Sequence, residues 1–183
     1  IAMPRGETSP EVWLLGSSDY SAALAAELGL PFAFAHFISG DAEAVTRMYR
    51  RHFRASSRLA EPRVLIAVAA LAAPTPEEAG ELAATIDLWR LRIRRGVDLP
   101  VPSRAEAQAY PYTADDRDEI GYNRRRLALG TPSGVRERIE AIAAAHQAHE
   151  AMILTITPDY ASRTRSYALL AEAFALTRPL SEV

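Results

Sequence analysis

Four apolar runs, each followed by a helical segment, constrain the fold of this chain more than any other feature. The runs lie at residues 12–15, 32–37, 63–71 and 150–157. Their residues are mainly apolar at odd and even positions alike, which is typical of strands in a parallel sheet that helices cover on both sides. Repeated strand–helix units are joined by right-handed crossovers, so the sequence predicts an α/β fold.

Capping residues and helix breakers mark the predicted helices. Thr75 precedes Pro76, which favours the first helical position, and this helix is expected to extend to Arg95. Ser133 is predicted to cap a helix from Val135 to His149. The remaining helices are predicted at residues 21–28, 41–58 and 161–176, and Asp159 is expected to cap the last of them.

The number of units indicates half of a barrel. A closed (β/α)8 TIM barrel takes about 250 residues, and this chain has 183 residues with four units. Four parallel strands alone would leave two bare edges. We therefore predict a TIM barrel to which this chain contributes about four βα units, the other half coming from the same natural protein or from a second copy of the chain. The alternative is a small open three-layer sheet. Because the first residue is Ile1 and not Met, we expect the natural chain to be longer.

The region from Val97 to Leu129 interrupts the strand–helix pattern. It contains prolines, many charges and three tyrosines, and it is too long for a simple connection. We predict a single domain over residues 1–183 in which residues 97–129 form an insertion over the barrel mouth, with a short helix near residues 115–127.

Composition narrows the class of protein further. The chain is 49% hydrophobic with a net charge of −2, which gives no general attraction to nucleic acid or to a membrane surface. It has no cysteine, so disulfides and a cysteine nucleophile are excluded, and we expect a cytoplasmic protein. No apolar run approaches the ~18 residues of a membrane span. The four histidines show no metal-ligand spacing, so we expect no metal site.

The residues Gly16-Ser17-Ser18-Asp19 separate the first strand from the helix that follows it. Backbone N–H groups of such a loop and of the helix N-terminus point the same way, and the helix dipole adds about half a positive charge there. This arrangement suits a phosphate. The alternative is that Ser18 or Asp19 serves only as a helix cap. No Gly-x-Ser-x-Gly elbow is present, so a serine hydrolase is rejected.

The chain resembles the bacterial luciferase-like flavin-dependent monooxygenases, in the C-terminal half of their barrel. The resemblance is carried by Trp13-Leu-Leu-Gly-Ser-Ser-Asp-Tyr-Ser21 followed by Gly29-Leu-Pro-Phe-Ala-Phe-Ala-His36, by Pro74-Thr-Pro-Glu-Glu78, by Gly130-Thr-Pro132, and by the last strand and helix. It implies that the phosphate of FMN contacts Ser17, Ser18 and Ser21. The implied cofactor-binding set is Gly16, Ser17, Ser18, Tyr20, Ser21 and His36. For His36, a histidine packed at a strand end is an equal alternative.

The resemblance also implies an activity. Reduced FMN and O2 would oxidise a small organic substrate, and this activity would need the missing N-terminal half of the barrel. The deazaflavin F420 is the less favoured cofactor, and catalytic residues are not assigned. The expected partners are the flavin, a small-molecule substrate, and either the other half of the barrel or a second copy in a homo-oligomer. The alternative function is a non-catalytic flavin-binding half-barrel or assembly protein.

Overall fold

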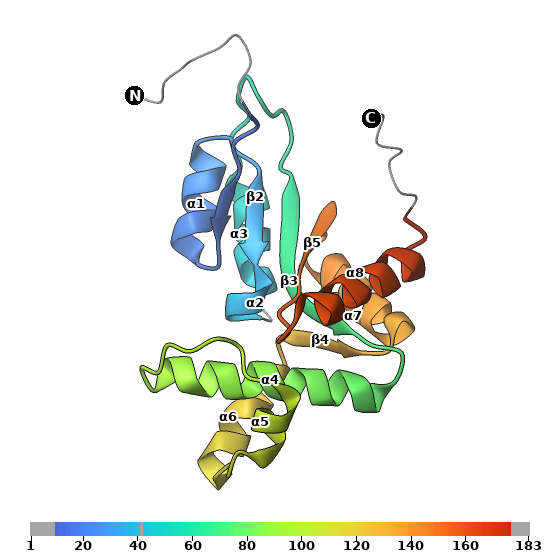
Figure 1. The fold of residues 1–183 in the computed structure, drawn as a ribbon. Coiled ribbons are helices and arrows are strands. Elements are labelled where there is room, and N and C mark those ends of the chain that lie inside the picture. The colour runs from blue at the N-terminus through green and yellow to red at the C-terminus, as the bar shows by residue number, and fades with distance from the viewer. Residues whose placement is uncertain (1–9, 41, 177–183) are drawn as a thin grey trace.

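The computed structural model describes residues 10–40 and 42–176, which form one parallel sheet with helices packed against it (Figure 1). The strands are β1 (Leu14–Gly16), β2 (Phe32–Ala35), β3 (Val64–Ala72), β4 (Leu127–Gly130) and β5 (Glu150–Leu154). The helices are α1 (Asp19–Glu27), α2 (His36–Ser39), α3 (Glu43–His52), α4 (Pro76–Arg94), α5 (Arg104–Ala109), α6 (Ala114–Arg124), α7 (Pro132–Ala145) and α8 (Tyr160–Ala173).

The long strand β3 organises the sheet. Its first residues, from Val64 to Ala67, pair with β2, and β1 pairs with the other edge of β2. β5 pairs with residues 65–69 of β3, so it lies on the edge opposite to β2. Ala69 pairs with both Leu127 of β4 and Leu154 of β5. β4 must therefore lie on the β2 side of β3, beyond the point where β2 ends.

Alternate residues of β3 face two different environments. One side, called here the outer face, carries the even-numbered residues 64–72 and packs against four helices. Val64 belongs to a cluster with Phe32, Phe34 and residues of α1 and α3. The next four even-numbered residues, Ile66, Val68, Ala70 and Ala72, pack against α7 and α8. Burial on this face supplies the main apolar core of the described chain.

The other side, called here the inner face, is covered only at one end. Ala69, Leu71 and Ala73 pack against α4, which crosses the sheet where the strands end (Figure 1). Nearer the start of the strands, Leu65 and Ala67 border an open hollow of about 420 Å³. The walls of this hollow also include Glu11, Trp13, Leu15, Ala33, Arg63, Glu150 and Met152.

The observed elements confirm the predicted α/β class and correct several details. The helix predicted over residues 41–58 is shorter, because α3 ends at His52 and Arg54 then bonds through its N–H to the carbonyl of Ala26 at 2.9 Å. Thr131, and not Ser133, caps α7. β4 was not predicted, because its apolar run of three residues carries little signal by itself.

The insertion contains two short helices that pack on α4. Helix α6 covers Ala114–Arg124, close to the predicted helix, and α5 precedes it. Both begin with a reciprocal capping box: Ser103 with Glu106 in α5, and Thr113 with Asp116 in α6. Ion pairs from Arg94 to Glu119 and from Arg95 to Asp116 join α6 to the end of α4.

Candidate functional site at the carboxyl ends of the strands

The predicted phosphate loop lies where β1 ends, at the edge of the sheet where α/β proteins bind their ligands. Gly16 pairs with Phe34 as the last residue of β1, and Ser18 is the N-cap of α1. The Ser21 hydroxyl donates to the Ser18 carbonyl at 2.7 Å and accepts from the Ser18 N–H at 3.2 Å. The Ser18 hydroxyl in turn accepts from the Ser21 N–H at 3.4 Å. The two serines therefore form a capping box that fixes the start of α1.

Gly16 is required by this capping box. A Cβ atom added at Gly16 would lie 2.2 Å from the Ser21 hydroxyl oxygen, well inside van der Waals contact. Any side chain at this position would displace Ser21 and open the reciprocal hydrogen bonds. Gly16 thus shapes the loop by allowing Ser21 to fold back against the strand end.

The donors that remain in the loop fit a phosphate. Ser17 is half-buried, and its hydroxyl forms no side-chain hydrogen bond in the described part of the chain. The first N–H groups of a helix have no partner within the helix, and here they belong to Asp19 and Tyr20. The Tyr20 side chain is 78% exposed, so it is accessible to a ligand. The Ser21 hydroxyl donates to the Ser18 carbonyl, and the Ser18 hydroxyl lies 3.3 Å from the Ser21 hydroxyl oxygen, so both serines hold the loop together. The Ser17 hydroxyl is the side-chain donor of this loop that forms no such bond within the described residues.

His36 lies two residues after Phe34, which pairs with Gly16, and its side chain lies between the sheet and the outer helices. The strand ends at Ala35, and His36 begins the short helix α2, although it was predicted as a strand residue. Its buried ring stands edge-on to His146 with centroids 6.1 Å apart, and His146 stacks on Phe34 of the outer face at 4.7 Å. This placement favours the interpretation of His36 as a packed histidine, and its contact with flavin stays a prediction.

A buried ion pair that sequence reasoning missed lies at the same edge of the sheet. The Nε and Nη2 atoms of Arg124 both donate to one carboxylate oxygen of Asp87, at 2.8 and 2.6 Å. Burial raises the pKa of the Asp87 carboxyl, and the hydrogen bonds and charge of Arg124 oppose that rise. The only available signal was an acidic residue within the apolar stretch of α4.

The polar residues at the end of the last strand serve the backbone. The Thr155 hydroxyl donates to the carbonyl of Ala70 at 2.8 Å, and that of Thr157 donates to the carbonyl of Asp159 at 2.7 Å. Asp159 caps α8, as predicted, by accepting from the Ser162 N–H. That hydrogen bond is the main cause of the lowered pKa of the Asp159 carboxyl.

No group of three or more histidine or acidic side chains within residues 10–40 and 42–176 has an arrangement that would hold a metal ion. Within the same ranges, no helix is both long enough and apolar enough to cross a membrane.

Comparison with known proteins identifies the family. The family model described as luciferase-like monooxygenase matches residues 1–149. The chain belongs to this family. The luciferase-like chain is 43% identical to the uncharacterized protein YwcH of Bacillus subtilis over 176 residues, which cover 95% of this chain and 53% of that protein. It spans about half the length of the curated relatives that it matches.

Solved structures agree with this assignment. The crystal structure of apo-MsnO8 superposes with a TM-score of 0.88 at 36% identity, over 97% of this chain and 54% of that one. The oxygenating constituent of 3,6-diketocamphane monooxygenase from Pseudomonas putida, solved in complex with FMN, superposes at 0.57 with 16% identity, over 93% and 50%, which shows a shared fold. The predicted family and the predicted half of a barrel are therefore confirmed.

Proposed function

We propose that this chain is the cofactor-phosphate-binding half of a flavin-dependent monooxygenase. The overall reaction would be FMNH2 + O2 + S → FMN + SO + H2O, where S is a small organic substrate. One oxygen atom enters the substrate, and the other leaves as water with the two hydrogens of the reduced flavin. When bound, the flavin supplies the oxygen chemistry, and the protein supplies binding, orientation and exclusion of water.

The observation that carries this proposal is the loop between β1 and α1. It combines a family match with donors that fit a phosphate: the Ser17 hydroxyl and the free N–H groups at the start of α1, with the Ser18 hydroxyl of the capping box beside them. Gly16 and Ser21 would keep these donors in place. FMN is preferred over F420, because a solved structure of this fold carries FMN.

The remaining parts of the chain have roles that follow from their positions. We propose that the N-terminal half of the barrel covers the open hollow of the inner face, where Leu15 is 61% and Met152 is 58% exposed. A homo-oligomer that covers the same surface is the second possibility. The insertion at residues 97–129 would lie over the barrel mouth, because α4, on which it packs, crosses the carboxyl ends of the strands.

The test uses the full-length natural protein with Ser17→Ala and Ser18→Ala combined. Each lost hydrogen bond to a charged phosphate should cost about 1.5–3 kcal/mol, which weakens FMN binding by at least tenfold. Fluorescence titration should show this loss for FMN but little change for riboflavin, which lacks the phosphate. The same titration with F420 decides between the cofactors.

The matched control is Ser103→Ala. Ser103 caps α5 through a capping box of the same kind, so its loss reproduces the capping cost of about 1 kcal/mol without touching the loop. Unchanged FMN affinity in the double variant would refute the phosphate site. Binding of FMN without consumption of O2 by the reduced full-length protein would favour the non-catalytic alternative.

A further inference from the structure

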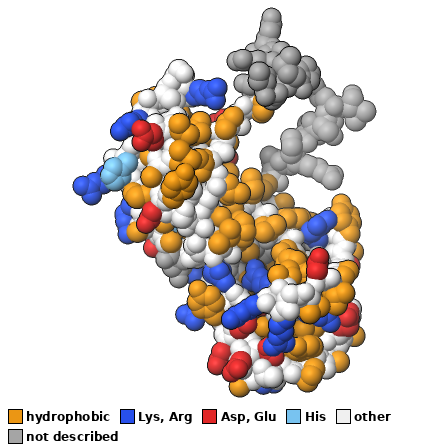
Figure 2. Space-filling view, turned by 90° about the vertical axis from the view of Figure 1, so that its left-hand side faces the viewer, with side chains coloured by type: hydrophobic (Ala, Val, Ile, Leu, Met, Phe, Trp, Pro, Cys, Tyr) orange, Lys and Arg blue, Asp and Glu red, His pale blue; other side chains and the backbone are white. Residues whose placement is uncertain are grey.

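Arginines crowd the junction between the sheet and the insertion, and most of them already have partners. Figure 2 shows basic side chains gathered where the two parts of the molecule meet. Four of these arginines pair with carboxylates: Arg92 with Glu106, Arg94 with Glu119, Arg95 with Asp116, and Arg124 with Asp87. Arg125 is exposed and lies over the ring of Tyr122 at 5.3 Å.

Two arginines of this group, Arg90 and Arg126, have no such partner. Neither forms an ion pair with any carboxylate of residues 10–40 and 42–176. Arg126 donates only to neutral oxygens, the carbonyl of Ile38 and the side chain of Asn123. Asp87 lies one helical turn before Arg90 on α4, but the hydrogen bonds of Arg124 already occupy one of its oxygens.

These two arginines are half-buried neighbours. Burial lowers the pKa of the Arg90 guanidinium, and the charge of Arg126 lowers it further, while Asp87 has a smaller opposite effect. The Nε atom of Arg126 is buried without a hydrogen-bond partner among the described residues. The Arg126 guanidinium also lies 5.0 Å from the ring centroid of Tyr122. Two like charges held close in a partly desolvated place repel each other, and an anion bound between them would relieve that repulsion.

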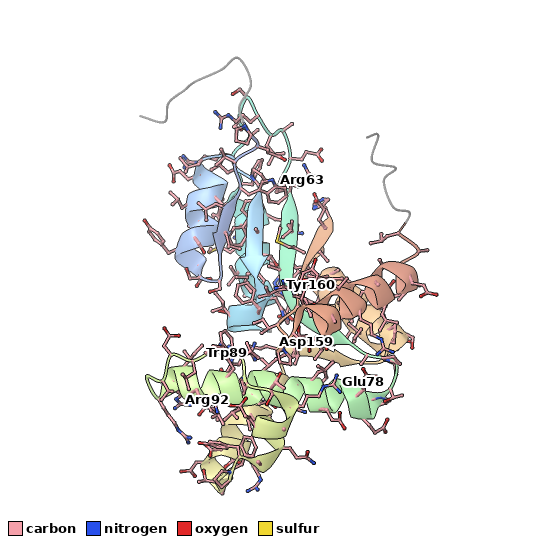
Figure 3. All side chains as sticks on the ribbon, viewed as in Figure 1. Arg63, Glu78, Trp89, Arg92, Asp159 and Tyr160 are labelled. Atoms are coloured by element: carbon pink, nitrogen blue, oxygen red, sulfur yellow. The ribbon has the colours of Figure 1, made fainter. Side chains whose placement is uncertain are left out.

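Arg126 lies where β2 ends and β4 begins, and Arg90 lies on the helix that crosses this part of the sheet. Arg90 follows Ile86 by four residues, so it lies on the same side of α4 as the residues that pack on the inner face. Arg126 immediately precedes Leu127 of β4, which belongs to the same cluster. Through Ile38, Arg126 touches α2, which follows β2 directly, and β2 is the neighbour of β1. Figure 3 labels Trp89, the residue before Arg90, between α4 and α2.

We propose that Arg90 and Arg126 together bind the anionic group of the substrate, a carboxylate or an oxyanion of similar size. This inference rests on the proposed flavin function and names the class of molecule that it oxidises. A guanidinium pair suits this role, because its planar N–H groups match the oxygens of such an anion. The loop after β1 is assigned the phosphate of the flavin, so the arginine pair is a second anion site at the same mouth.

The test measures anion binding on the FMN-loaded full-length protein with acetate and inorganic phosphate as probes. Melting temperature is recorded against each probe at constant ionic strength, with chloride as the reference. Wild type should gain stability as either probe replaces chloride. Arg90→Gln and Arg126→Gln should weaken the apparent affinity for acetate by at least tenfold, and Arg126→Lys should retain part of it.

Arg125→Gln is the matched control. It removes one positive charge from the same segment but leaves the proposed pair intact, so its response to acetate should equal that of wild type. The melting temperatures in chloride show whether each variant is folded. A wild-type protein that ignores both probes, or an Arg90→Gln variant that keeps the full response, would overturn the proposal.

The flavin phosphate is the other possible source of the anion, and the titrations separate it. Arg90→Gln should leave FMN affinity within about twofold of wild type. If it weakens FMN but not riboflavin, the arginines hold the cofactor and the assignment to substrate is wrong. Conversely, an unchanged FMN affinity after the Ser17 and Ser18 replacements refutes the phosphate loop. The acetate response of the Arg90→Gln variant tests the arginine pair independently of that result.

Discussion

The central strands β2 and β3 and the edge strands β1 and β5 are similarly apolar in sequence but differ sharply in burial. Every residue of β2 and β3 is buried, and Ile66 is fully inaccessible. In β1, Leu15 is 61% exposed, and in β5, Met152 is 58% and Leu154 is 40% exposed. Strands with apolar residues on both faces are stable when neighbours cover them. The difference shows that β1 and β5 lack neighbours that the central strands possess.

At the open end of the inner face, a charged group lies beside a small apolar cluster of Ala33, Leu65 and Ala67. Arg63, labelled in Figure 3, pairs with Glu150 at the start of β5 and lies 3.5 Å from the carboxylate of Glu11. Its guanidinium stands 5.1 Å from the ring centroid of Trp13. These side chains are 41–57% exposed, so ion pairs of this kind contribute at most about 1 kcal/mol each. They cannot replace the burial that the edge strands lack.

The largest expected effect comes from expressing residues 1–183 alone. Each backbone group that is left unpaired and shielded from water costs about 1–3 kcal/mol, against a domain stability of only about 5–15 kcal/mol. We expect self-association through β1 and β5, or loss of a cooperative melt, in light scattering and calorimetry. A monomer with a sharp melting transition at micromolar concentration would show that the edges are stable and that the open-sheet alternative is sufficient.

An intermediate effect distinguishes a buried strand residue from an exposed one. In the full-length protein, Ile66→Ala should lower the free energy of unfolding by about 2–5 kcal/mol, because it leaves a cavity in the outer-face core. If the other half of the barrel covers β5, Met152→Ala should cost a similar amount there. Denaturant titration measures both.

Replacement of an exposed surface residue usually changes the free energy of unfolding by less than about 0.5 kcal/mol. Met152→Ala in the full-length protein would fall in this range if Met152 stayed uncovered. That result would contradict the proposed covering of β5 by the N-terminal half.

The smallest expected effect concerns the insertion, whose contacts lie within this chain. The pKa of Asp116 is lowered first by the hydrogen bond from the Thr113 N–H, with a smaller contribution from the charge of Arg95. A carboxyl whose pKa is lower in the folded than in the unfolded protein stabilises the fold fully at pH values above its unfolded-state pKa of about 4. This stabilisation is lost as the pH falls from there through the lowered pKa of the folded protein. Asp116→Asn should therefore flatten the acid side of the stability profile.

Thermal melting between about pH 2 and pH 7 checks this prediction, with Asp118→Asn on the exposed side of the same helix as the control. An unchanged acid slope in Asp116→Asn would show that the capping box of α6 does not contribute to stability. Because this anchor is internal to the chain, its effect should be the same with and without the rest of the barrel, provided that the shorter chain folds.

The sequence determined most of the strand–helix order, with β4 and the short helices α2 and α5 as exceptions, and it did so through local chemistry. The cap at Thr75, the cap at Asp159 and the apolar run of β3 act over a few residues, so pattern alone located them. The loop from Gly16 to Ser18 was predicted for the same reason. The family was recognised from short motifs, and the comparison confirmed it.

Tertiary structure decided what local pattern cannot encode. His36 was placed on a strand from its neighbours in sequence, but the chain turns at Ala35 and buries the ring beside His146, which lies 110 residues further on. The crossing of α4 over the inner face brings Arg90 beside Arg126 and makes Asp87 a buried partner of Arg124. Such contacts depend on packing between distant elements, because charge pairing and burial are set by three-dimensional neighbours and not by spacing along the chain.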